Sequence, residues 1–220
     1  MKLRVKLAKL GLKLLHRYWK PGVLKVQGLT IKRCPQVFIP GRLTMTSLLL
    51  AEALDVREGF EVLDVGCGSG ILSLVAARRA RRVVAVDINP KALQCTIYNA
   101  KVNGLEGKIE ARLGSLFQPL KPGEKFDLIV ANLPYLPGRP QSLLEAGWLD
   151  DGSLTLKLLR EASQWLKPGG LLQMAYSTLG SLAGKEILEA ASEGGLKLLK
   201  VERRRWLFET FEIYKFTPSR

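Results

Sequence analysis

Residues 62–76 read VLDVGCGSGILSLVA. The apolar run that starts this stretch reaches Val65, glycines follow at positions 66, 68 and 70, and a second apolar run comes directly after them. Glycine allows a tight turn and lets a ligand approach the backbone closely. Open α/β sheets bind their ligands at the carboxyl ends of the strands. The stretch therefore predicts a strand, a ligand-binding loop and a helix, in that order.

Beyond residue 60, short β-branched runs alternate with longer helical segments. We predict strands at residues 61–66, 82–87, 108–114, 125–132 and 170–176, and helices near residues 70–80, 90–103, 153–166 and 180–193. This alternation predicts right-handed crossovers and a mostly parallel sheet covered on both faces. Two further strand-like runs, at residues 196–205 and 207–216, predict an antiparallel hairpin at one edge of the sheet.

The glycine spacing bears on the ligand. It is G-x-G-x-G, which disfavours a dehydrogenase, because the dinucleotide motif is G-x-G-x-x-G. Asp87 ends the next predicted strand and offers an acceptor where the diol of a ribose would lie. Alternatively, Asp87 only caps the helix that starts near Asn89 and Pro90.

Positive charge is concentrated at the N-terminus of this chain of net charge +14. Residues 1–51 hold eleven Lys or Arg and no Asp or Glu. Basic and leucine side chains recur there at steps of three and four, which predicts an amphipathic helix ending at Pro21–Gly22, although Gly11 is unfavourable inside it. Its basic face is only solvated, or binds phosphate or another acidic partner, or lies on a membrane surface.

Other sites and locations are disfavoured by the sequence. No apolar run approaches the about 18 residues of a membrane-spanning helix, and lysines interrupt the N-terminus where an export signal would be continuously apolar, so we expect a cytoplasmic protein. Cys34, Cys67 and Cys95 form no C-x-x-C pair, and His16 is the only histidine. We therefore expect reduced thiols and no metal site.

VLDVGCGSG, with VVAVDINP at residues 83–90, resembles the first two motifs of the class I S-adenosylmethionine (SAM) dependent methyltransferases. The resemblance covers roughly residues 36–216. It implies a Rossmann-like α/β fold, with a seven-stranded, mostly parallel sheet of order 3-2-1-4-5-7-6 and helices on both faces. We assign residues 1–35 to a short basic helical extension and residues 36–220 to a SAM-dependent methyltransferase domain.

The resemblance also implies which residues hold SAM. The cofactor would lie over Gly66, Gly68 and Gly70, with Asp64 near its amino group and Asp87 on its ribose. Many members have an acid at the end of the third strand, where this chain has Ser115, so the backbone of Ser115 and Leu116 is expected to contact the adenine. The full expected cofactor set is Thr44, Asp64, Gly66, Cys67, Gly68, Gly70, Asp87, Ile88, Ser115, Leu116 and Asn132. Cys67 is expected to be a small filler and not a reactive thiol.

The stretch ANLPYLPG, residues 131–138, follows the fourth predicted strand at the same edge as the glycine loop. An NH₂ group on a carbonyl or an aromatic ring is a poor nucleophile, because its lone pair is delocalised. We expect the Asn132 side-chain oxygen and the Leu133 carbonyl to accept one N–H each, which directs the lone pair at the methyl group. Pro134 would fix the loop, and Tyr135 would stack on the planar acceptor. The alternative is ordinary turn chemistry after a strand.

This motif is similar to the Asn-Pro-Pro-Tyr signature of amino and amide N-methyltransferases, with Leu133 in place of the first proline. The upstream stretch VFIPGRLTMTSLLLAEAL, residues 37–54, resembles the pre-motif of HemK (PrmC) type protein-glutamine methyltransferases. Pro40 and Thr44 match that pre-motif, and Leu43 replaces its usual acid. Asn-Leu-Pro-Tyr itself resembles the KsgA-type rRNA adenine dimethyltransferases, whose N-terminal pattern does not appear in this sequence.

These observations favour a SAM-dependent N-methyltransferase that acts on a glutamine side chain of a release-factor type protein. The alternative substrate is an adenine N6 or similar exocyclic amine in rRNA or tRNA, suggested by the basic N-terminus and by Arg203–Arg205. A third possibility is a catalytically idle module of the same fold that binds RNA or a ribosomal partner. The intact glycine loop and Asn132 argue against this third reading.

Overall fold

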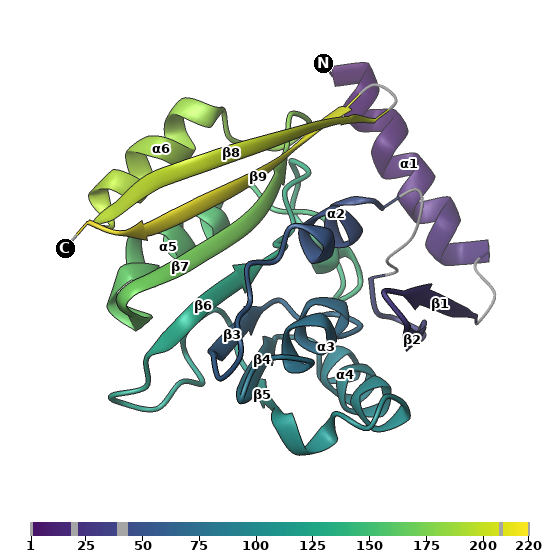
Figure 1. The fold of residues 1–220 in the computed structure, drawn as a ribbon. Helices are drawn as coiled ribbons and strands as arrows, with labels where there is room; N and C mark the ends of the chain where they lie inside the picture. The colour runs from purple at the N-terminus through teal and green to yellow at the C-terminus, as the bar shows by residue number, and fades with distance from the viewer. Residues whose placement is uncertain (1, 19–21, 39–43, 207–208, 220) are drawn as a thin grey trace.

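The computed structural model describes residues 2–18, 22–38, 44–206 and 209–219. Its centre is a seven-stranded sheet with the order β5-β4-β3-β6-β7-β9-β8 (Figure 1). Counted along the chain within this sheet, the order is 3-2-1-4-5-7-6, which confirms the expected topology. The strands are β3 (Glu61–Val65), β4 (Arg82–Asp87), β5 (Ile109–Leu113), β6 (Phe126–Ala131), β7 (Leu166–Ser177), β8 (Leu196–Trp206) and β9 (Glu209–Pro218).

The sheet is parallel from β5 to β7, and β9 is antiparallel to both β7 and β8. Helices cover both of its faces (Figure 1). They are α2 (Thr46–Glu52), α3 (Ile71–Ala77), α4 (Pro90–Val102), α5 (Ser153–Glu161) and α6 (Gly184–Glu193), with short 3₁₀ turns at Glu106–Lys108, Glu145–Gly147 and Ala162–Trp165. The predicted helix at 153–166 thus ends earlier, because its last turn is 3₁₀ and Leu166 already belongs to β7.

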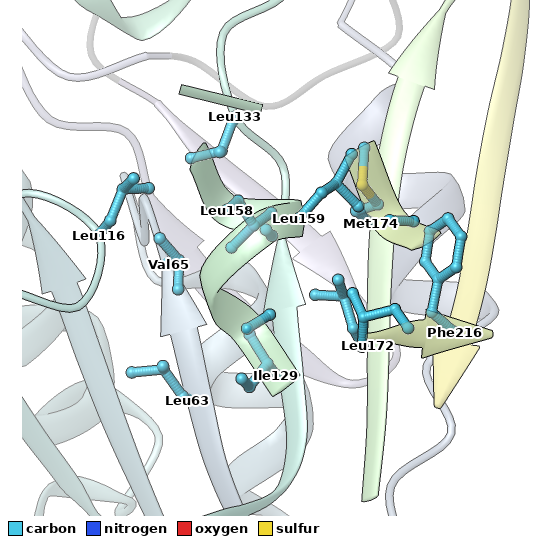
Figure 2. Packing of buried hydrophobic residues seen from close by; sticks show 14 of the residues in the cluster. Leu63, Val65, Leu116, Ile129, Leu133, Leu158, Leu159, Leu172, Met174 and Phe216 are labelled. Atoms are coloured by element: carbon cyan, nitrogen blue, oxygen red, sulfur yellow. The ribbon is translucent and has the colours of Figure 1, made fainter. Parts of the chain in front are cut away.

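Each face of the sheet has its own apolar cluster, because successive side chains of a strand point to opposite faces. Val62 packs in one cluster with Leu74 of α3. The neighbouring Leu63 packs in the other, with Leu158 of α5 and Ile187 of α6. Figure 2 shows the second cluster, in which side chains of the central strands face those of α5. Burial on both faces keeps the carboxyl ends of β3, β4 and β6 in a fixed arrangement at one edge.

The N-terminal region contains a hairpin that the sequence did not predict, formed by β1 (Val23–Val26) and β2 (Leu29–Lys32). Gln27 and Gly28 make its turn, both with positive φ. The hairpin packs on α4, where Asn103 accepts the N–H of Thr30 at 2.9 Å and Asn99 accepts that of Lys32 at 2.8 Å. A domain boundary at residue 35 stays a prediction.

The expectation of reduced thiols was wrong for two of the three cysteines. Cys34 and Cys95 form a disulfide, although 61 positions separate them in the sequence. Packing of the hairpin on α4 brings their Cα atoms to 6.0 Å, a distance that only the tertiary structure sets. Cys67 is a free, buried thiol, as expected.

Helix α1 (Lys2–Tyr18) confirms the predicted N-terminal helix, although its expected end at Pro21 lies outside the described residues. Its inward side chains, Val5, Ala8 and Leu12, pack against a small cluster that includes Leu136 and Trp148. Of the helices described, none combines the length and apolar character needed to cross a bilayer. Helix α1 therefore lies against the body of the protein, beside the loop that follows β6.

Candidate functional site

Two pockets meet at the Asn-Leu-Pro-Tyr loop. The first, called here the glycine-loop pocket, lies at the carboxyl ends of β3, β4 and β6. The second, called the α1 pocket, lies between α1, the loop after β6 and the end of the β8–β9 hairpin. The residues that line both pockets are Phe38, Asn132, Leu133, Pro134 and Gly147. A group held in one pocket can therefore reach a group held in the other across Asn132.

The glycine-loop pocket gathers most of the residues that the sequence assigned to a cofactor. They are Gly66, Cys67, Gly68, Asp87, Ile88, Ser115, Leu116 and Asn132. A Cβ on Gly68 would meet nothing within 4 Å, so open space lies directly in front of the loop. Gly66 and Gly68 both have positive φ, which explains why glycine is needed at this turn.

Asp87 organises the floor of this pocket. One carboxylate oxygen accepts the N–H of Gly68 at 2.9 Å, and the other accepts the N–H of Asn89 at 2.8 Å. Burial raises the pKa of Asp87 above its ordinary value, and these backbone N–H groups oppose that rise. The N-cap of α4 is Asn89, whose side chain accepts the N–H of Lys91. Asp87 therefore fixes the loop instead of capping the helix, and it still faces the pocket.

Asp64 lies behind the pocket wall and is fully buried. One of its oxygens accepts the hydroxyl of Ser73 at 2.5 Å, whereas the other, Oδ1, has no partner among the described residues. Burial raises the pKa of Asp64 to about 7, while the bond from Ser73 opposes this rise. A buried carboxyl with an unused oxygen is suited to a cationic group, because a buried charge needs a partner of opposite sign.

Ser115 and Leu116 line the pocket at its far side. Leu116 is buried and has a φ of +52°, a left-handed conformation that is rare for a leucine. Strained backbone of this kind concentrates at ligand sites. The exposed side chain of Ile88 and the buried one of Val37 add apolar surface to the same pocket.

Besides Asp64, two more of the expected cofactor residues lie outside the lining of the glycine-loop pocket. Gly70 caps α3 with positive φ, and a Cβ there would lie 2.9 Å from the hydroxyl of Thr96, so this glycine allows close packing. Thr44 lines the α1 pocket. Pro40, which matches the pre-motif, and Leu43, which replaces its usual acid, lie outside the described residues.

Two hydrogen bonds from its side-chain NH₂ group hold Asn132 in one orientation. Its Nδ2 donates to the hydroxyl of Ser47 at 2.7 Å and to that of Thr46 at 3.3 Å. Its Oδ1 is buried and accepts no hydrogen bond from the described residues. Since both N–H groups are engaged, the oxygen is the atom left to bind a ligand. It is therefore a preformed acceptor where the two pockets meet.

Tyr135 lines only the α1 pocket, and its hydroxyl donates to Glu209 at 3.3 Å. Its ring lies 5.8 Å from that of Tyr176, in a tilted arrangement. Glu209 also accepts the hydroxyl of Ser177, and burial raises the pKa of Glu209. The tyrosine is thus anchored from behind by a carboxyl group that the sequence did not single out.

Most walls of the α1 pocket were missed by the sequence analysis. They include Leu7, Gly11, Trp148, Trp206 and Glu209. These residues come from both ends of the chain and from the loop after β6, and no local motif connects them. Only Gly11 gave a signal, as a residue that is unfavourable in the middle of a helix.

The glycine-loop pocket fits the cofactor that the sequence implies. The unpartnered oxygen of Asp64, behind the pocket wall, suits an ammonium group, and the carboxylate of Asp87, in the lining, suits ribose hydroxyls. The apolar side chains of Ile88 and Leu116 suit a planar base.

Comparison with known proteins identifies the family of this chain. A family model described as "Methyltransferase small domain" matches residues 28–191. A protein of Methanocaldococcus jannaschii named "Putative protein N5-glutamine methyltransferase MJ0928" is 30% identical over 199 residues, covering 87% of this chain and 96% of that protein. A ribosomal RNA small subunit methyltransferase C of Escherichia coli is 34% identical over 161 residues, covering 72% of this chain and 43% of the relative. The chain thus spans less than half of that rRNA methyltransferase.

Solved structures of methyltransferases resemble this chain as well. A 16S rRNA N2 methyltransferase of T. thermophilus, in complex with AdoMet and guanosine, has a TM-score of 0.66 and 26% identity, over 92% of this chain and 51% of that one. A ribosomal protein L11 methylase of Lactobacillus delbrueckii subsp. bulgaricus has a TM-score of 0.61 and 25% identity, over 84% and 82%. The chain belongs to the methyltransferase small domain family and is a SAM-dependent N-methyltransferase.

Proposed function

We propose that this enzyme methylates the side-chain nitrogen of a glutamine in a release-factor type protein, in the cytoplasm. The observation that carries the proposal is the buried, unpartnered Oδ1 of Asn132 at the junction of the two pockets. An acceptor in that position binds an N–H group, and a primary amide supplies one. The M. jannaschii relative, which matches over nearly its whole length, carries the name of a protein glutamine methyltransferase.

The cofactor supplies a methyl group on a sulfonium, which is strongly electrophilic without an added acid. The chain supplies the alignment. Asn132 Oδ1 and the Leu133 carbonyl each accept one N–H of the substrate amide, which turns the nitrogen lone pair toward the glycine-loop pocket and stabilises charge that develops on the nitrogen. Ser47 and Thr46 keep the Asn132 oxygen in place. Tyr135, held by Glu209, offers its ring to the planar amide.

On the cofactor side, Asp64 is proposed to receive the amino group of SAM and Asp87 its ribose. Gly66 and Gly68 let the cofactor lie against the backbone. Ile88, Ser115 and Leu116 would enclose the adenine, with backbone contacts from Ser115 and Leu116 in place of an acidic side chain. Gly70 supports this pocket from outside its lining, by the close packing of α3 on Thr96, whereas Thr44 lines the α1 pocket.

An exocyclic amine of RNA is the second candidate acceptor. It offers the same planar NH₂ group to Asn132, and Trp148 and Trp206 give the α1 pocket aromatic walls on which a base could stack. The relatives named as rRNA methyltransferases and the basic N-terminus favour this candidate. The fuller coverage of the glutamine methyltransferase relative favours the first.

The test is incubation of the protein with SAM carrying a labelled methyl group, separately with release factor, rRNA and tRNA. We expect label in the release factor, on glutamine by mass spectrometry. Label in RNA alone would overturn the glutamine proposal. Asn132→Ala should abolish transfer while SAM affinity, measured by calorimetry, changes by no more than about threefold, because the lost oxygen binds the acceptor. A large loss of SAM affinity would instead make Asn132 a cofactor residue.

A further inference from the structure

Helix α1 has an outward apolar stripe that the fold leaves uncovered. Its members are Leu3, Leu7, Leu10, Leu14 and Tyr18, and their exposed fractions run from 46% to 72%. At 3.6 residues per turn these positions share one side of the helix, within an arc of about 80°. The helix packs on the body through a different side, formed by Val5, Ala8 and Leu12. We call this exposed set the outer leucine stripe.

A basic stripe runs beside it. Lys2, Lys6, Lys9, Lys13 and Arg17 occupy the adjoining side of α1, again within an arc of about 80°. Of these, Lys9 donates to the carbonyl of Pro137 and Lys13 pairs with Glu145. Lys6, Lys9 and Lys13 also line a shallow groove together with Arg139. An occupant of the outer leucine stripe would therefore lie next to a row of positive charge.

The outer leucine stripe reaches the α1 pocket. Leu7 belongs to the stripe and also lines that pocket, as does its neighbour Gly11. Trp206 lines the same pocket, with 42% of its surface exposed, and the exposed Arg204 and Arg205 precede it in β8. Apolar and positive surface thus continues from α1 to the hairpin around the site where Asn132 presents its oxygen.

We propose that this surface docks an acidic, amphipathic segment of the protein substrate, whose apolar side lies on the outer leucine stripe. This inference rests on the proposed function. The four leucine side chains of the stripe accept the apolar face of a helix, as in helix-in-groove recognition, and they give bases and phosphates neither stacking nor hydrogen bonds; only Tyr18 of the stripe has a ring that can stack. The basic stripe selects acidic residues along the edge of the segment. A flat lipid surface on the same stripe would cover Leu7 and the adjoining pocket, whereas a docked chain can continue into the pocket with its glutamine.

Two double variants test the docking surface. Leu3→Gln with Leu10→Gln removes apolar area from the stripe without changing the charge, and neither residue lines the α1 pocket. The matched control is Leu188→Gln with Leu199→Gln, which are exposed leucines of α6 and β8. With intact release factor as the acceptor, KM should rise about tenfold for the stripe variant and stay unchanged for the control. With a short peptide around the acceptor glutamine, both variants should behave like the wild type.

Other outcomes would overturn the docking inference. If the stripe variant has an unchanged KM for the release factor, the outer leucine stripe does not bind the factor. If its KM rises equally for the release factor and the short peptide, the substitutions act on the α1 pocket and not on a docking surface. Wild-type binding to phosphatidylglycerol vesicles that the stripe variant loses would assign the surface to a membrane. A wild-type dimer in sedimentation that the variant dissociates would assign it to a second copy. If only RNA is methylated by the wild type, the proposed function itself fails, before the variants are compared.

Discussion

Asn132 and Asp64 each bury one side-chain oxygen that has no partner in the described part of the chain. A buried acceptor without a hydrogen bond costs roughly 1–3 kcal/mol, so two of them beside one site destabilise the free enzyme. In the proposed complex, each oxygen would gain a hydrogen-bonding partner. The hydrogen bonds formed on binding would recover this cost and so would strengthen the binding of SAM and the acceptor.

The pKa of Asp64 leads to a test with SAM. Burial raises it from 3.8 to about 7, so in the free enzyme the contribution of Asp64 to stability is present below pH 3.8 and is lost as the pH rises through about 7. An ammonium group favours the ionised carboxylate, so SAM binding should release a proton near pH 6. We expect SAM affinity to rise roughly five- to tenfold from about pH 6 to 7.5.

Calorimetry in buffers of different ionisation enthalpy measures both the affinity and the proton release. Asp64→Asn should bind SAM more weakly and without this pH dependence. A variant that keeps the wild-type pH profile would show that another group titrates.

The presence of a glycine at position 11, inside a helix, is explained by the α1 pocket that Gly11 lines. Its Cβ position meets nothing within 4 Å and its φ is not positive, so α1 itself does not require a glycine there. Gly11→Ala should stabilise the protein by about 0.5–1 kcal/mol in thermal or denaturant unfolding. Gly11→Phe should fill the α1 pocket and lower kcat/KM for the release factor at least about tenfold, with SAM affinity unchanged. Full activity of the Phe variant would place the acceptor elsewhere.

At the scale of elements, the disulfide joins the segment after β2 to α4. Cys34 and Cys95 pack with Val37 and Ala92, and both of these line the glycine-loop pocket. Closing a loop of this length stabilises a fold by about 4 kcal/mol in the chain-entropy model. We expect Cys34→Ser with Cys95→Ser to lose roughly that much stability and several-fold in SAM affinity.

The measurement is denaturant unfolding and SAM titration with and without dithiothreitol. Reductant should bring the wild type to the level of the double variant and leave the variant unchanged. The control is Cys67→Ser, because Cys67 is a free, buried thiol outside the disulfide. This variant should lose stability on reduction as the wild type does. A wild type that does not respond would contradict the structural role of this disulfide.

The edge of the sheet at β5 contains a network of charged side chains. Glu124 pairs with Arg112 at 2.6 Å and with Arg82 at 2.9 Å. The pKa of Glu124 is lowered from 4.5 to about 2, chiefly by its hydrogen bond with Arg112. Its contribution to stability is present above pH 4.5 and is lost as the pH falls through about 2. Glu124→Gln should cost about 1–3 kcal/mol at pH 7 and much less near pH 2. Urea unfolding at both pH values measures it, and an equal cost would rule out an ionic origin.

The elements differed in how far the sequence could predict them. The central strands β3, β4 and β6 were found because each contains β-branched residues and is largely buried, between clear turn and helix signals. The β1–β2 hairpin was missed because its strands have four residues each and its turn is Gln27–Gly28, without an Asn-Gly or Asp-Gly signal. The disulfide was missed because it follows from the packing of that hairpin on α4.

At the scale of the whole molecule, the sequence predicted one side of the site and missed the other. The proposed cofactor side is built from short motifs at the ends of adjacent strands, so Gly66 and Asp87 could be predicted from the sequence, as could Asn132 at the junction of the two pockets. The acceptor side combines α1, at one end of the chain, with Glu209 and Trp206 of the terminal hairpin. Only the complete fold brings these parts together, and this is why the sequence indicated the reaction more clearly than the substrate.

The distribution of charge over the whole chain should appear in the kinetics. The net charge of +14 comes largely from residues 1–51, and α1 places part of it beside the α1 pocket. Association with an acidic protein is then accelerated by long-range attraction, which salt screens. We expect kcat/KM for the release factor to fall about tenfold from roughly 50 to 500 mM salt, while kcat changes little.

Lys6→Gln with Arg17→Gln should flatten this salt dependence, because both positions belong to the basic stripe. Lys101→Gln with Lys197→Gln removes the same charge from exposed positions on α4 and β8 and should keep the wild-type slope. Equal slopes for the two variants would show that net charge alone attracts the substrate. A flatter slope for the α1 variant only would show that the positive charge acts where the acceptor must enter.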